Sequence, residues 1–138
     1  MKISLTNSKE VYEFLNKEWN SFFNSKKVKR QTKPQYYFFK IEENNKIAGA
    51  SVLSVKSNIG TIEDILIKKD CREKGIGKEL LKSIENKARE ENCRKILLKT
   101  SNIHTEAKSF YLSNGYKQIA ALPNLWYNSD WYFFVKEL

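Results

Sequence analysis

The chain has 138 residues, 41% of them hydrophobic and 13% aromatic, which suffices for one domain with a substantial core and argues against disorder. Its formal net charge of +9 at pH 7 comes almost entirely from lysine and favours an anionic partner: a nucleic acid, a membrane surface or a phosphorylated cofactor. The two cysteines, Cys71 and Cys93, match neither a zinc motif nor a disulfide framework, so we expect reduced thiols and no metal.

No apolar stretch approaches the roughly 20 residues that cross a membrane, and residues 1–7 lack the apolar segment of a signal peptide. We therefore expect a cytoplasmic protein with no membrane partner. The basic run over residues 26–33 is more typical of a solvated loop than of a nucleic-acid site, because lysine lacks the planar fork with which arginine reads phosphates and bases.

The hydrophobic pattern predicts a single α/β domain of the α+β kind over residues 1–138, with a mixed central sheet of about seven strands flanked by helices. The expected strands are residues 1–5, 36–42, 47–55, 61–67, 95–100, 116–122 and 131–137. A capping signal from Asn7 to Glu10 precedes an amphipathic helix. A second helix covers residues 77–92, and a short third helix, capped by Thr105, ends at Gly115. The second helix joins strands 61–67 and 95–100 in a βαβ unit, so these two strands should be parallel.

The loop between strand 61–67 and the second helix has the composition of a phosphate-binding turn. Gly75 and Gly77 allow the backbone to turn sharply and to approach a ligand closely. The N–H groups at the start of the helix then point outward, where the free donors and the helix dipole both favour negative charge. Lys74 and Lys78 add positive charge nearby. Two glycines alone would also fit an ordinary tight turn, so the surrounding order of elements decides the interpretation.

That order is Arg-x-x-Gly-x-Gly after a strand and before an amphipathic helix, and it resembles the coenzyme A signature of the GCN5-related N-acetyltransferase (GNAT) superfamily. The resemblance covers essentially the whole chain and implies one GNAT-like domain, with acetyl-coenzyme A as the cofactor. It implies that the loop holds the pyrophosphate and that the backbone of the preceding strand holds the pantetheine. The implied cofactor-binding residues are Ile65, Leu66, Ile67, Arg72, Glu73, Lys74, Gly75, Ile76, Gly77 and Lys78.

A second motif, Ala107-x-x-Phe110-Tyr111-x-x-x-Gly115, is similar to the family's helix that carries a tyrosine and ends at a glycine. It implies that Tyr111 is the general acid that protonates the leaving thiolate. His104 falls where many members have a cofactor-contacting asparagine. A role for His104 in cofactor binding therefore competes with a surface or capping role.

Two adjacent carboxylates, Glu63 and Asp64, lie among apolar residues just before the loop. An amine acceptor has a pKa of roughly 10.4 when it resembles lysine, so it must lose a proton before it attacks a thioester. Ile62-Glu63-Asp64, with Arg72 nine positions after Glu63, is similar to the diamine acetyltransferases. This likeness implies that Glu63 is the base, acting through water. Strand alternation places Asp64 on the other face, where it is a candidate for substrate binding.

The resulting hypothesis is an N-acetyltransferase that moves acetyl from acetyl-coenzyme A to a primary amine of a small molecule by direct attack in a ternary complex. An enzyme of the same superfamily that acetylates protein N-termini or lysines is the alternative. A non-catalytic basic nucleic-acid-binding module is disfavoured, because it leaves the joint register of Glu63, Arg72 and Tyr111 unexplained. A homodimer is a candidate assembly. Four aromatic residues near the C-terminus could line the acceptor pocket, although core or a dimer face is the favoured interpretation: Trp126, Tyr127, Trp131 and Tyr132.

Overall fold

A computed structural model describes residues 1–138 in two compact units, Met1–Thr32 and Lys33–Leu138. The first unit contains helix α1, Ser8–Ser25. Its predicted capping signal is confirmed, because the Asn7 side chain accepts a hydrogen bond of 3.0 Å from the Glu10 N–H. The predicted strand at residues 1–5 is wrong: these residues have no regular structure. A weak alternation of apolar and polar residues over so short a segment does not by itself form a strand.

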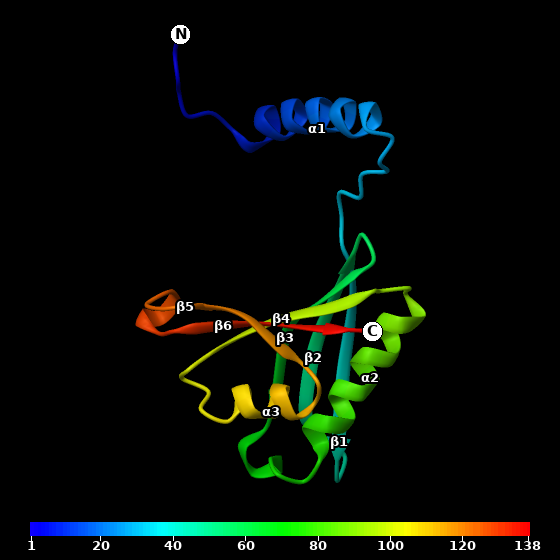
Figure 1. The fold of residues 1–138 in the computed structure, drawn as a ribbon, viewed down its shortest axis with the longest axis vertical. Coiled ribbons are helices and arrows are strands. Elements are labelled where there is room, and N and C mark those ends of the chain that lie inside the picture. The colour runs from blue at the N-terminus through cyan, green and yellow to red at the C-terminus, as the bar shows by residue number, and fades with distance from the viewer. The chain divides into compact units, whose positions relative to one another are not determined.

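The second unit contains the sheet. Its strands are β1 (Gln35–Glu43), β2 (Lys46–Lys56), β3 (Ile59–Ile67), β4 (Lys95–Ser101), β5 (Lys117–Leu122) and β6 (Trp131–Glu137). Its helices are α2 (Ile76–Glu90) and α3 (Ala107–Ser113), with short 3₁₀ turns η1 (Lys69–Cys71) and η2 (Trp126–Asn128). The order β1-β2-β3-β4-β6-β5 makes one mixed sheet of six strands (Figure 1). The count is one below the predicted seven because residues 1–5 add no strand.

The middle of the sheet is split. β3 and β4 are parallel, as the βαβ pattern predicted, but they pair over only three residues, 59–61 of β3 with 95–97 of β4. Beyond Thr61 the edge of β3 that faces β4 has no ladder partner, whereas its other edge stays paired to β2 as far as Ile67. The backbone groups on this free edge are therefore open to another partner.

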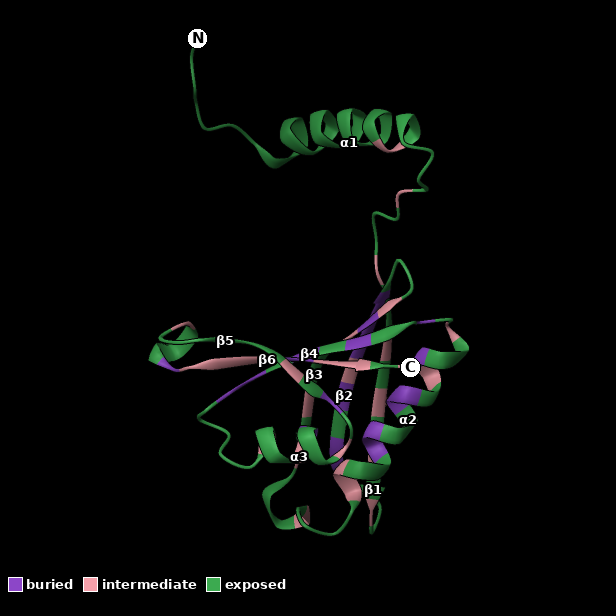
Figure 2. Ribbon diagram, in the orientation of Figure 1, coloured by how far each residue is buried: buried purple, intermediate pink, exposed green.

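The core lies where both helices of this unit meet the sheet. α2 contacts β1, β2 and β3, and α3 contacts β4 and β5. Figure 2 shows the buried residues along the side of α2 that faces the strands. This is the apolar stripe that the helical spacing predicted. The stripe consists of Leu80, Leu81, Ile84 and Ala88, and it joins one cluster with residues such as Leu53, Ile96, Tyr111 and Phe134.

A buried ionic contact fixes α2 against the end of α3. Glu85 of α2 is 7% exposed and receives hydrogen bonds from Lys136 Nζ at 2.9 and 3.0 Å. The Tyr116 hydroxyl donates a third, of 3.2 Å, to the same carboxylate. Lys136 Nζ also donates to the Asn114 carbonyl at 2.9 Å. The carboxylate is thereby paired, as a buried charge must be.

Two local expectations are corrected by the backbone. Thr105 does not cap α3, whose N-cap is Glu106 without a side-chain cap hydrogen bond. The prediction that Glu63 and Asp64 point to opposite faces is also wrong. Val52 pairs with Asp64 while the next residue, Leu53, pairs with Ile62. Glu63 is therefore the extra residue of a β-bulge, which interrupts the alternation on which the prediction depended.

No helix of the chain has the combined length and apolar character needed to cross a membrane.

Candidate active site

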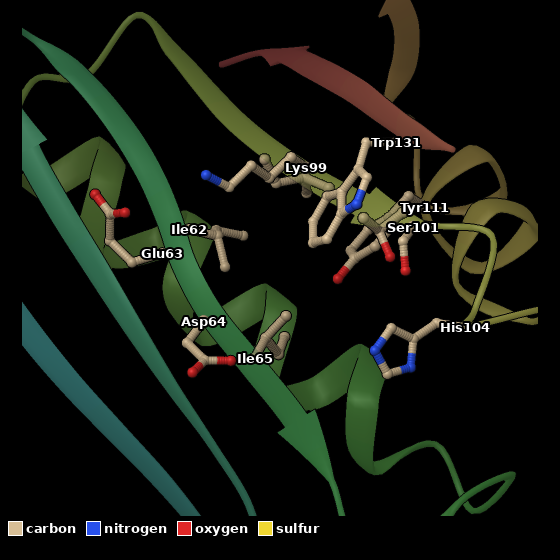
Figure 3. A pocket seen from close by; sticks show the side chains of 11 residues that line it. Ile62, Glu63, Asp64, Ile65, Lys99, Ser101, His104, Tyr111 and Trp131 are labelled. Carbon is tan, nitrogen blue, oxygen red and sulfur yellow. The ribbon is translucent and has the colours of Figure 1, made fainter. Parts of the chain in front are cut away.

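Two cavities meet where β3 and β4 separate. The smaller has a volume of about 180 Å³ and lies between residues 62–65 of β3, residues 98–101 of β4, and the side chains of His104, Tyr111 and Trp131 (Figure 3). The larger, of about 690 Å³, follows β3 to the loop before α2 and is also lined by α3. Both cavities are lined by Asp64, Ile65, Thr100, His104 and Tyr111. A long ligand in the larger cavity can therefore present its end to a molecule in the smaller one.

The loop before α2 forms one end of the larger cavity. Gly75 is the N-cap of α2 in the left-handed conformation, φ 79°, and no side chain caps the helix. The first N–H groups of α2 are therefore available to a ligand, in a place where the helix dipole favours an anion. Nothing lies within 4 Å of a Cβ built on Gly75, so this glycine is required by its backbone conformation and not by crowding.

Gly77 serves a different purpose. A Cβ at Gly77 would lie 3.3 Å from Cζ of Phe110, so its absence allows α3 to pack closely against the start of α2.

The other residues of the loop differ in what they contact. Arg72 donates from Nε to the Ile67 carbonyl at 3.0 Å, which ties the loop to the end of β3. Arg72, Glu73, Gly75, Gly77 and Lys78 line the larger cavity, whereas Lys74 and Ile76 do not. Lys74 instead pairs with Glu43 at 3.5 Å.

Tyr111 stands between the two cavities. Its side chain is buried, 6% exposed, and its ring packs against Phe110, Tyr116 and Phe134 with centroid distances of 5.3, 5.8 and 5.7 Å. Its hydroxyl points into the smaller cavity (Figure 3). Burial, and secondly the negative charge of Asp64, raise the pKa of Tyr111 to about 12. The phenol therefore keeps its proton at neutral pH and can donate it.

The carboxylates of Glu63 and Asp64 are both exposed and both residues border the smaller cavity. They leave β3 on the same side, while Ile62 and Ile65 leave it on the other (Figure 3). The bulge explains this pairing, because two successive residues then face one residue of β2. Glu63 Oε1 accepts a hydrogen bond from the Ser54 hydroxyl at 2.5 Å. Asp64 borders both cavities and is the carboxylate whose charge acts on Tyr111.

Several lining residues were not predicted. Thr100 and Ser101 lie at the carboxyl end of β4, and Lys99 and Trp131 also border the smaller cavity. Ligands of open α/β sheets commonly bind at the carboxyl ends of strands, so the position of Thr100 and Ser101 could have been expected. Trp131 was among the four C-terminal aromatic residues considered for the acceptor pocket. Its sequence context did not show whether it lines a pocket or belongs to the core.

A sequence model of the Acetyltransferase (GNAT) family matches residues 8–116. The chain belongs to the GNAT acetyltransferase family. It is similar to an uncharacterized N-acetyltransferase of Methanocaldococcus jannaschii, MJ1530, with 31% identity over 67% of this chain and 60% of that protein. The chain spans 53% and 60% of the lengths of two curated relatives that it matches. The family is one of acetyltransferases.

Solved structures share the fold. An acetyltransferase from Bacillus cereus ATCC 14579 superimposes with a TM-score of 0.81 at 23% identity, covering 100% of this chain and 98% of that one. An acetyltransferase from Bacillus anthracis strain Ames, solved in complex with acetyl coenzyme A, has a TM-score of 0.69 and 27% identity over 78% of this chain and 65% of that one. The predicted fold is therefore confirmed, with six strands in this chain.

The larger cavity fits this cosubstrate. Its uncapped helix N-terminus, with Arg72 and Lys78 beside it, suits a diphosphate. The free edge of β3 at residues 65–67 suits the amide groups of pantetheine, because an extended chain can bond to an unpaired strand edge. The cavity leads to Tyr111, where the thioester end would lie. These assignments remain predictions for the individual residues.

We expect Gly75→Val to weaken acetyl-coenzyme A binding. A β-branched residue disfavours the left-handed backbone by about 1–2 kcal/mol, which corresponds to about a 5- to 30-fold loss if the bound loop must keep that conformation. Asn92→Val places the same side chain in another left-handed position, φ 58°, at the far end of α2. Calorimetric titration of both folded variants is the measurement. Equal affinity of parent and Gly75→Val would contradict the assignment of this loop.

Proposed function

We propose that this chain transfers the acetyl group of acetyl-coenzyme A to a primary amine of a small molecule by direct attack, with both substrates bound at once. The observation that carries this proposal is the meeting of the two cavities at Asp64, Ile65, Thr100, His104 and Tyr111. A route through both cavities places donor and acceptor in contact without a covalent enzyme intermediate. The smaller cavity, about 180 Å³ in volume, suits a small acceptor better than a peptide chain.

The acceptor side of the proposed reaction uses the carboxylate pair. The acetyl thioester supplies an activated carbonyl carbon when it is bound. Glu63, exposed and oriented by Ser54, takes the proton of the acceptor ammonium group through a water molecule. Asp64, also bordering the cavity, attracts and orients the ammonium group before it is deprotonated.

The donor side uses Tyr111 and the free edge of β3. Tyr111 holds its proton because its pKa is raised to about 12, and its hydroxyl faces the smaller cavity, so it donates to the leaving thiolate. Backbone N–H groups of residues 65–67 position the donor along the strand. His104 borders both cavities and is a further candidate contact for the cosubstrate.

An acetyl-transfer screen across amines, aminoglycosides, amino acids and peptides tests this function. We expect turnover with small primary amines and release of free coenzyme A in equal amount. Turnover confined to peptides would instead favour the alternative, an enzyme for protein N-termini or lysines. Absence of transfer to every acceptor, by a protein that binds acetyl-coenzyme A, would contradict the proposal. The cytoplasmic location and the homodimer remain predictions.

A further inference from the structure

Lys99 is a cation at the smaller cavity that the proposed reaction does not use. It projects from β4 beside the cavity that also contains Glu63 and Asp64. Other lysines form ion pairs with carboxylates, but Lys99 takes part in none of these pairs. Its ammonium group instead lies over the Trp126 ring, 4.5 Å from the centroid. An ammonium group that borders a binding cavity without a carboxylate partner is available to an anionic group of a ligand.

The structure holds Lys99 in this position through the segment before β6. The Trp131 indole N–H donates to the Trp126 carbonyl at 2.9 Å, and the two rings meet edge to face at 5.2 Å. Asp130 anchors the same segment: its carbonyl accepts from the Asn102 N–H at 2.9 Å, and its N–H donates to Asn102 Oδ1 at 3.2 Å. The Trp126 face that attracts the ammonium group is therefore fixed relative to β4, which reduces the conformational freedom Lys99 would lose on binding.

We infer that the acceptor carries a carboxylate in addition to its amine, as an amino acid does, and that Lys99 recognises this carboxylate. The inference rests on the proposed transfer to a small amine. The cavity presents two carboxylates on β3 and one cation on β4, on the two strands that border the split in the sheet. An amine attracted to Glu63 and Asp64 leaves the opposite end of the molecule toward Lys99. A zwitterionic acceptor matches both ends, whereas a simple diamine places a second cation beside Lys99.

Matched acceptors test the inference. Each amino acid is compared with its decarboxylation product: phenylalanine with phenethylamine, tryptophan with tryptamine, and lysine with cadaverine. The measurement is the ratio of kcat/KM within each pair, for the parent, Lys99→Met and Lys99→Arg. Intrinsic differences in reactivity between the two acceptors of a pair are the same for the parent and its variants. These differences therefore cancel when the kcat/KM ratio of a variant is compared with that of the parent. Lys95→Met is the control variant, since Lys95 lies on the same strand but pairs with Glu137 at 3.0 Å and is absent from the cavity lining.

We expect the parent to prefer the carboxylate-bearing member of at least one pair, and Lys99→Met to reduce that preference by about 10- to 100-fold, as for loss of a charged hydrogen bond. Lys99→Arg should keep most of the preference, and Lys95→Met all of it.

Three results would overturn the inference. The first is a parent without preference for any carboxylate-bearing acceptor, which leaves the proposed acetyl transfer intact. The second is an equal slowing of both members of a pair by Lys99→Met, which would mean that Lys99 does not recognise the acceptor's carboxylate. The third is failure to acetylate any acceptor while acetyl-coenzyme A still binds, which removes the proposed small-amine function together with this inference.

Discussion

Replacement of Tyr111 by phenylalanine is expected to lower kcat by about 10²–10⁴-fold, the usual contribution of a general acid, with little change in acetyl-coenzyme A affinity. The ring contacts with Phe110, Tyr116 and Phe134 remain in the variant, so the lost group is the hydroxyl. Steady-state kinetics with one good acceptor and calorimetry with acetyl-coenzyme A separate the two effects. Tyr116→Phe makes the same chemical change at a residue outside both cavities and controls for loss of a buried hydroxyl.

The pH profile of the parent enzyme provides a second measurement on Tyr111. Its raised pKa, about 12, means that the phenol stays protonated while pH rises through 10, where an ordinary tyrosine would lose its proton. Loss of the acid should therefore cause no fall in rate below about pH 11. An unchanged kcat in Tyr111→Phe, with the chemical step shown to limit turnover, would remove this residue from the mechanism.

The second large effect is expected for Glu63→Gln, which keeps the size of the side chain and its contact with Ser54 but removes its basicity. We expect kcat/KM at neutral pH to fall by about 10²-fold or more. Part of this loss should return as pH rises toward the pKa of the acceptor amine, because more acceptor is then already neutral. A pH–rate profile from neutral to alkaline pH is the measurement.

Asp64→Asn is the matched variant, because the bulge places both carboxylates at the same cavity. We expect its main effect on KM for the acceptor, with the shape of the pH profile kept. If Asp64→Asn loses the alkaline dependence while Glu63→Gln keeps the parent profile, the two roles are exchanged. Asp64 is the carboxylate that acts on the Tyr111 pKa, so this exchange is the specific alternative. If neither variant changes the profile, the base is a water chain or another residue.

Features determined by neighbours in the sequence were predicted well. The apolar stripe of α2, the capping of α1 by Asn7 and the parallel βαβ unit all follow from local spacing and short connections. The loop at Gly75 was equally accessible, since a glycine at φ 79° at the start of a helix has a direct sequence signature. These features indicated the family, which the family match confirms, and they predicted a position for the cosubstrate that stays a prediction.

Features that depend on strand partners were decided by the tertiary structure. Residues 1–5 alternate weakly in hydrophobicity but form no strand. Glu63 and Asp64 share a side because the pairing of β3 with β2 contains a bulge at Glu63. The separation of β3 from β4 after Thr61 also has no local signature, yet it creates the opening in which the two cavities meet. Lys99 and Trp131 become cavity residues only through that opening. Alternation along a strand predicts the face of a residue only where the ladder is regular, whereas bulges and cross-strand neighbours are set by the register of the whole sheet.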